Sequence, residues 1–427
     1  MLFSSKQLSL CLYTAMMNNF LEIAKLLIRY GANVSERLPI QSSRLDNKYQ
    51  VPYLHMALKC KDKDLIKLLL DHGANVNDVN NTGENSLHLA LHTHDLTILE
   101  LLLEKSCDLQ AISTWGVTIL NTAILRGNIN AVSMILKAGA DIKAQHHTGL
   151  TPMHFAAMSD VDNTNIAELL LARGVPVDDG DKDLVKPLHL ALEYNNKRMM
   201  YFLVKHGANI NSKTESSLFP LYLAVQFNHS STVEFLLDKG AKINEVAEKY
   251  RLFSALHIAC MMESEEKINV LLEYGADINI GSSNKTAFSM IENKCTRSAH
   301  IMIKHMVKMN DQHLMVNEKD MQSICKSKNL KLFYEQCCNE IIRMKYYKVY
   351  NNISYYYVLI CHKKKLIPLA RNLNFTKAFQ FRDKLKMFPI YAAEMKVKFR
   401  RAEIMNKASQ LILSEVFRTK SQAKLLK

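Results

Sequence analysis

The residues whose types and spacing come nearest to a metal site are His88, His92 and His94, in the segment H-L-A-L-H-T-H. His88 and His92 stand four residues apart, as in zinc-binding helices, but no Glu follows the first His as the metalloprotease helix requires. His88 also belongs to a phrase that recurs along the chain, and the other histidines of that phrase have no such partners: His55, His154, His189 and His257. We therefore expect a structural role for His88, and no metal or other cofactor.

Cysteine chemistry is not indicated either. The nine cysteines are scattered, without a C-x-x-C or other paired spacing, so reduced thiols in the cytoplasm, or alternatively the nucleus, are the expectation. Cys337 and Cys338 fall on a predicted amphipathic helix with no histidine at a fixed spacing, which favours buried thiols over a nucleophile. The chain also lacks a Gly-rich phosphate loop, a nucleophile elbow and paired carboxylates. We predict that it is not an enzyme and has no catalytic residues.

The elements that must position any functional residue are repeats. The segment 65–77 reads L-I-K-L-L-L-D-H-G-A-N-V-N, an apolar helical run that ends on Gly and a short tail. The Gly place recurs at intervals of 33 to 35 residues after a first interval of 42, as Gly31, Gly73, Ser106, Gly139, Gly174, Gly207, Gly240 and Gly275. A period near 33 residues indicates stacked helix pairs, each of which buries its apolar stripe only against its neighbours.

Each repeat opens on a second phrase, of which Thr151-Pro152-Met153-His154 is the fullest copy. Thr or Ser can cap the first helix, Pro suits its first turn, and His can bond neighbouring backbone. Asn121 and Tyr222 take the His place in two repeats. Period, phrases and order together resemble the ankyrin-repeat family. The resemblance implies an all-α solenoid of helix-turn-helix repeats with β-hairpin fingers, about eight repeats and a degenerate cap over residues 1–310.

Charge separates this array from the rest of the chain. Residues 311–427 hold 24 Lys and Arg against 9 Asp and Glu, a net charge of +15, whereas residues 1–310 sum to −1. We predict a small, basic, helical C-terminal domain over 311–427. Its clusters K-K-K at 363–365 and K-V-K-F-R-R at 396–401 have aromatic neighbours and could bind nucleic acid or import receptors. The alternative is a solvated helix face.

In the ankyrin family, target proteins bind at the fingertips and on the exposed inner face of the first helices. Alignment on the His place assigns Tyr49 and Trp115 to fingertips and the others to the inner face. The predicted target-binding residues are Tyr49, Trp115, Arg126, Met158, Tyr194, Phe227, Met261 and Met262. Large apolar groups at places that core packing does not require favour a protein-binding patch. The alternative is incidental exposed hydrophobes.

The C-terminal region resembles the PRANC domain, which follows ankyrin arrays in poxvirus, parasitoid-wasp and intracellular-bacterial proteins. The residues that carry the resemblance are Cys338, Glu340, Ile341, Met344, Lys345, Ile353, Ser354 and the phrase Phe388–Tyr391. It implies an F-box-like adaptor that recruits a Skp–cullin ubiquitin ligase. The segment after Phe417, R-T-K-S-Q-A-K-L-L-K, lacks the Leu-Pro of the F-box core, so that core is missing or degenerate. Ligase docking would then rest on Phe388, Pro389, Ile390, Met395, Phe399 and Leu411.

Three functions follow as alternatives. The first is a monomeric, non-enzymatic adaptor that captures a target protein on the array and links it to a Skp–cullin ligase. The second is an inhibitory decoy that sequesters its partner without a ligase. The third is a nuclear or nucleic-acid-binding module that uses the basic C-terminal part. No run of 18 apolar residues is present, so we expect no membrane-spanning helix.

Overall fold

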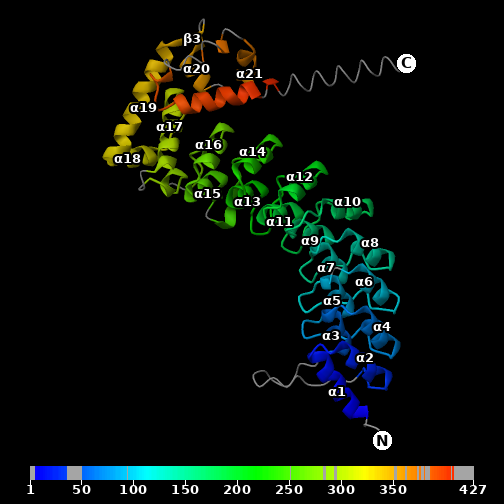
Figure 1. Cartoon of the computed structure of the whole chain (residues 1–427). Coiled ribbons are helices and arrows are strands. Elements are labelled where there is room, and N and C mark those ends of the chain that lie inside the picture. Colours follow the sequence, from blue (N-terminus) through cyan, green and yellow to red (C-terminus); the bar gives the residue numbers. More distant parts are fainter. Residues whose placement is uncertain are drawn as a thin grey trace, which may run out of the picture. The chain divides into compact units, whose positions relative to one another are not determined.

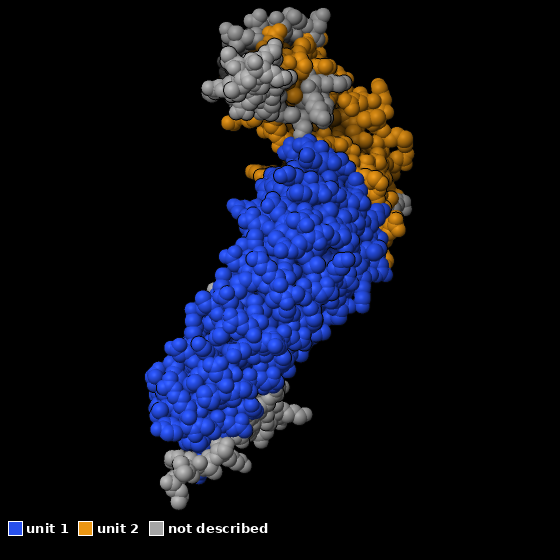
Figure 2. Space-filling model, turned by 90° about the vertical axis from the view of Figure 1, so that its right-hand side faces the viewer, with its two compact units in different colours: residues 1–241 blue, residues 242–427 orange. Residues whose placement is uncertain are grey.

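The computed structural model describes residues 5–35, 51–93, 95–250, 252–281, 285–292, 296–350, 353–360, 363–372, 375–376, 379, 385–404 and 406–407. The chain forms two compact units, Met1–Ala241 and Lys242–Lys427, which Figure 2 shows in blue and orange. We call them unit 1 and unit 2. No described helix is long and apolar enough to cross a membrane.

Unit 1 is a succession of short helix pairs, coloured from blue to green in Figure 1. First helices of neighbouring pairs contact one another, as α3 does α5 and α9 does α11, and second helices do the same, as α6 does α8. The pairs are α1 (Ser5–Met17) and α2 (Leu21–Arg29), α3 (Tyr53–Cys60) and α4 (Lys63–Asp71), α5 (Ser86–Thr93) and α6 (Leu96–Leu103), α7 (Ile119–Leu125) and α8 (Ile129–Lys137), α9 (Pro152–Met158) and α10 (Thr164–Ala172), α11 (Pro187–Glu193) and α12 (Lys197–Lys205), and α13 (Pro220–Phe227) and α14 (Ser230–Asp238).

The second helix of a pair begins and ends where local chemistry requires it. At the start of α4, the Asp62 carboxylate accepts the backbone N–H of Leu65 at 2.9 Å, which satisfies an otherwise unpaired donor. At the far end of α8, Gly139 has φ +102°, and Ser106 holds a left-handed φ of +45° at the same place after α6. Both residues thus end the second helix with a left-handed backbone, a conformation that Gly adopts without strain.

The histidine of the opening phrase links one repeat to the next. In α9, the Thr151 backbone N–H donates to His154 Nδ1 at 3.0 Å, and His154 Nε2–H donates to the Val185 carbonyl oxygen at 2.8 Å. His257 Nε2 reaches the Lys285 carbonyl in the same way, at 3.0 Å. Both ring nitrogens are thus used by a neutral ring, and burial lowers the pKa of His154. His88 Nε2 contacts the Val117 carbonyl at 3.3 Å in the same way, which is the structural role predicted for His88.

The repeat with Asn121 in the histidine place lacks this link. The Asn121 side chain is fully buried in α7, and neither its Oδ1 nor its Nδ2 has a hydrogen-bond partner among the described residues. A buried amide without a partner costs free energy, because it has given up its bonds to water. This substitution in the repeated phrase therefore makes α7 a weak point of the stack.

The fingers between the pairs are mostly turns that bond from one repeat to the next. The Thr114 backbone N–H donates to the Thr82 carbonyl at 2.8 Å, and that of Lys182 to the Thr148 carbonyl at 3.0 Å. Over the described part of the chain, the only finger with a strand pair is the one in unit 2 that contains β1 (Val246–Ala247) and β2 (Phe253–Ser254). The predicted hairpin fingers are thus present chiefly as hydrogen-bonded turns.

Unit 2 holds a further repeat pair and a helical region that packs on it. α16 contacts α17, and α17 contacts α19. α17 ends at Asp311, so the domain boundary predicted at residue 310 falls in its last turn. The elements are η1 (Glu248–Tyr250), α15 (Ala255–Met261), α16 (Glu265–Glu273), η2 (Phe288–Met290), α17 (Arg297–Asp311), α18 (Glu318–Lys326), α19 (Lys328–Tyr346), β3 (Lys348–Tyr350), β4 (Ile353–Ser354), α20 (Tyr355–Ile360) and α21 (Lys363–Arg371). Residues 392–404 form one more helix.

Two buried carboxyl groups stand out in unit 2. Glu340 on α19 accepts the backbone N–H groups of Ile390 at 3.2 Å and Tyr391 at 2.9 Å. Asp320 on α18 is 2% exposed, and its Oδ1 accepts the Thr286 hydroxyl at 2.6 Å. Its other oxygen has no partner in the described part of the chain. Glu340 therefore holds the backbone of residues 388–391 by two hydrogen bonds, whereas only one of the two Asp320 carboxyl oxygens has a hydrogen-bond partner among the residues described.

Candidate protein-binding groove

A groove with a volume of about 540 Å³ opens on the surface of unit 1. Each of several successive repeats supplies part of its lining, because the inner-face places of the first helices recur with the period of the repeat. The lining includes Glu84, His92, Trp115, Arg126, Met158, Asp160 and Tyr194. We call this surface the groove.

Two aromatic side chains give the groove an apolar rim. Trp115 is 72% exposed and Tyr194 56% exposed, which no packing requirement of the repeats explains. The Trp115 backbone is held in place, because His146 Nε2–H donates to its carbonyl oxygen while the Thr148 backbone N–H donates to His146 Nδ1. Exposed aromatics of this kind are typical anchors of protein interfaces.

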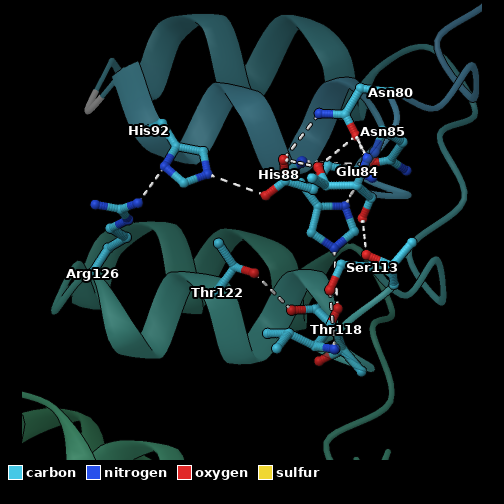
Figure 3. A network of polar contacts seen from close by, with 12 residues as sticks. Asn80, Glu84, Asn85, His88, His92, Ser113, Thr118, Thr122 and Arg126 are labelled. Carbon is cyan, nitrogen blue, oxygen red and sulfur yellow. Dashed lines mark hydrogen bonds and ion pairs between the residues drawn. The ribbon is translucent and has the colours of Figure 1, made fainter. Parts of the chain in front are cut away.

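A chain of polar contacts runs along the groove from the finger before α5 to the end of α7 (Figure 3). Asn80 Nδ2 and the Thr82 hydroxyl donate to the Glu84 carboxylate at 3.0 Å and 2.8 Å. His92 Nε2 faces Glu84 Oε1 at 3.5 Å, and Arg126 Nη2 donates to His92 Nδ1. Arginine cannot accept a hydrogen bond, so Nδ1 carries no proton and the His92 proton lies on Nε2.

Glu84, at one end of this row of polar contacts, is the group whose ionisation decides its charge. Burial works against ionisation of Glu84, but the hydrogen bonds from Asn80 and Thr82 and the nearby His92 hold the pKa of Glu84 below its ordinary value. Glu84 is therefore a carboxylate at neutral pH. It accepts the His92 Nε2–H, which turns the other ring nitrogen toward Arg126.

The repeats of the chain also match a known family. The family model described as "Ankyrin repeats (3 copies)" matches residues 7–80, 54–146, 120–214 and 212–282. The chain belongs to the ankyrin-repeat family. A crystal structure of the human ASB11 ankyrin repeat domain is 26% identical, with a TM-score of 0.47, and covers 52% of this chain and 98% of that domain. No curated protein matches the chain. The resemblance of the C-terminal region to the PRANC domain stays a prediction.

The ankyrin groove gathers four of the residues that the sequence assigned to target binding: Trp115, Arg126, Met158 and Tyr194. Phe227 is 43% exposed at the end of α13, in the same unit but outside the lining. Met261 and Met262 are exposed on unit 2. Tyr49 lies outside the described residues. That these side chains bind a protein stays a prediction.

Two of the groove residues that the sequence did not assign to target binding are acidic. Glu84 lies in the finger before α5, and Asp160 follows the end of α9. Neither occupies a place that the repeat keeps constant, so alignment on the His place gave no signal for them. The polar finger N-N-T-G-E at 80–84 was the available hint, since clustered Asn, Thr and Gly form turns whose side chains bond locally.

The residues assigned to ligase docking mostly belong to the core of unit 2. Phe388 and Met395 are fully buried and Phe399 is 3% exposed, so these three side chains offer no surface to a partner. They close the unit's own core instead. Pro389 is exposed and Ile390 half-buried. Leu411 lies outside the described residues.

The basic cluster at 396–401 is partly neutralised within unit 2. Lys398 Nζ donates to the Leu359 carbonyl at 2.6 Å and lies 3.8 Å from the Glu394 carboxylate. Arg401 pairs with Glu273 at 2.7 Å. Two of the cluster's cations thus serve the fold, which weakens the case for a nucleic-acid surface at this cluster.

Proposed function

We propose that this ankyrin protein captures a target protein in the groove and works as a non-enzymatic adaptor in the cytoplasm or the nucleus. Ankyrin repeats support protein–protein interaction, and the observation that carries the proposal is the exposure of Trp115 and Tyr194, from two different repeats, in one groove. Aromatic side chains supply large contact areas for little loss of conformational freedom. A partner that covers them would gain the free energy of burying their apolar surface.

Recruitment of a Skp–cullin ubiquitin ligase is the second step of the proposal, and it rests on the resemblance of the C-terminal region to the PRANC domain. The burial of Phe388, Met395 and Phe399 removes the surface that the sequence suggested for this step. An inhibitory decoy, which would hold its target without a ligase, is therefore the second candidate function.

Affinity purification of the full chain followed by mass spectrometry tests target capture. We expect the double variant Trp115→Ala, Tyr194→Ala to lose proteins that the wild type retains, because truncation of interface aromatics often costs about 2 kcal/mol or more. Tyr30→Ala is the matched control, since Tyr30 is also 72% exposed in unit 1 but does not line the groove. Equal retention by all three proteins would contradict the groove as the capture site.

The same eluates separate adaptor from decoy. Skp and cullin subunits that co-purify with the wild-type chain support the adaptor, and their absence while the target is retained supports the decoy. The full chain must be used. A truncation at 388 would remove Phe388, Tyr391 and Met395, which are fully buried, and would therefore disrupt unit 2.

A further inference from the structure

We propose that the groove recognises a peptide segment that places one carboxylate on Arg126 and an adjacent apolar side chain against Trp115 and Tyr194. This inference rests on the proposed capture of a protein in the groove and adds the chemistry of the captured segment. The ligand class is a short linear segment with a single acidic group, from an Asp, a Glu or a chain terminus, next to a large apolar residue.

Arg126 is presented as a receptor for an anion. Its side chain is exposed in the groove, and its sole partner among the described residues is His92 Nδ1. One of the five guanidinium N–H donors is used there, so the others are available to a ligand. A carboxylate can accept two parallel N–H bonds from a guanidinium, which makes it the acceptor that best fits the free edge.

The contact to His92 also fixes the direction of that edge. His92 is itself held by Glu84, which accepts bonds from Asn80 and Thr82. A long side chain that is already oriented loses less freedom on binding than one that moves freely in solvent. An ordinary solvated arginine would not need this chain of contacts, which runs from Asn80 through Glu84 and His92 to Arg126 (Figure 3).

The charges of the groove restrict the ligand to a single acidic group. Arg126 is the one permanent cation of the described lining, whereas Glu84 and Asp160 are both acidic. A run of acidic residues would meet Asp160 and be repelled, since like charges in a partly enclosed groove are unfavourable. The apolar neighbour of the acid would be placed by Trp115, Leu125 and Tyr194, which line the same groove.

Selection from a displayed library of random linear peptides on the immobilised full chain tests the inference. We expect the selected peptides to share one Asp, Glu or terminal carboxylate beside an aromatic or aliphatic residue. Arg126→Gln should weaken the best peptide by roughly tenfold to a hundredfold, the effect of losing hydrogen bonds to a charged group. Arg126→Glu should bind the matching peptide whose acidic residue is replaced by Lys, and should reject the original.

The control and the positioning role of His92 sharpen the result. Arg173→Glu changes a charge near the end of α10, outside the groove lining, and should leave affinity unchanged. His92→Leu should weaken the acidic peptide several-fold, and His92→Gln, which keeps an acceptor, should restore part of the loss.

The outcomes separate the inference from the proposed function. Peptides that lack an acidic residue, that bind Arg126→Glu as well as wild type, or that cannot be selected at all would overturn the carboxylate assignment. If selected peptides without an acidic residue still needed Trp115 and Tyr194 for binding, the proposed capture in the groove would stand without the carboxylate assignment. If the variants at Arg126, Trp115 and Tyr194 all bound as wild type does, both the carboxylate assignment and capture in the groove would be contradicted.

Discussion

Replacing Asp320 by Asn should stabilise unit 2 at neutral pH and weaken it slightly near pH 4. Asp320 is 2% exposed, and only one of its oxygens has a partner among the described residues, the Thr286 hydroxyl. Burial raises the pKa of Asp320 to about 6 against the effect of that hydrogen bond, and the charge of Glu292 adds to the rise. At pH 7.5 the native state therefore carries a poorly satisfied buried carboxylate.

The size and sign of the effect follow from the two pKa values. In the unfolded chain the pKa of Asp is about 3.9, so the native state binds the proton more tightly. The free energy of unfolding therefore falls as pH rises from about 4 to about 6, by about 3 kcal/mol in all. Asn cannot ionise, so its stability does not change over this pH range. Relative to the protonated Asp320, its buried amide group without a partner costs about 1 kcal/mol. Asp320→Asn should gain about 2 kcal/mol at pH 7.5 and lose about 1 kcal/mol at pH 4.

Hydrogen exchange of the α18 and α19 amides, read by mass spectrometry, measures this difference. Wild type and variant are compared at the same pH, so that intrinsic exchange rates cancel. Tryptophan fluorescence would not serve, because the chain's one Trp, Trp115, lies in unit 1. Glu335→Gln, at an exposed carboxyl on α19, is the control and should match wild type at both pH values. A difference between Asp320→Asn and wild type that is the same at pH 4 and pH 7.5 would refute the reasoning.

Three further predictions concern the stability of single sites. Gly139→Val should lower the thermal midpoint of unit 1, because a β-branched residue at φ +102° is strained by about 1–2 kcal/mol, and an unchanged midpoint would contradict the repeat register. Asn121→His should raise the urea midpoint of unit 1 and add about 1 kcal/mol to the free energy of unfolding, because histidine at this place has partners in other repeats whereas the amide has none among the described residues. A lower midpoint would show that the site cannot hold the ring. Glu340→Ala should destabilise unit 2 by about 1–3 kcal/mol, since the backbone N–H groups of Ile390 and Tyr391 would lose their acceptor, and exchange protection of 388–395 would report it.

The helix pairs were predictable because each depends on a local phrase. Asp62 caps α4 and Gly139 ends the turn after α8, and both signals are legible without knowledge of the neighbours. The same logic located Trp115 and Tyr194, since an apolar residue at a place that the core does not use must be exposed. Glu84 and Asp160 were not predicted as groove residues, because the repeat does not specify which residue type occupies their positions.

The C-terminal region was harder to predict for a physical reason. A stripe such as Met395 and Phe399 has the same helical spacing whether it faces a partner or its own core, and only the tertiary fold decides. The fold decides through distant pairs: Glu340 bonds the backbone of Tyr391, a contact across 51 residues with no local signature. The single hydrogen bond of the buried Asp320 carboxyl depends in the same way on Thr286, 34 residues earlier.

The histidine links between repeats have a consequence for how this chain can vary. His88, His154 and His257 each bond a backbone carbonyl of the following repeat, belonging to Val117, Val185 and Lys285. A carbonyl is the same whatever its side chain, so the joint places almost no demand on the partner residue, as the change from Val to Lys shows. Mutation can therefore change the groove-facing residues of one repeat while the hydrogen bonds between repeats are kept. An array of this kind can acquire a new target without first becoming unstable.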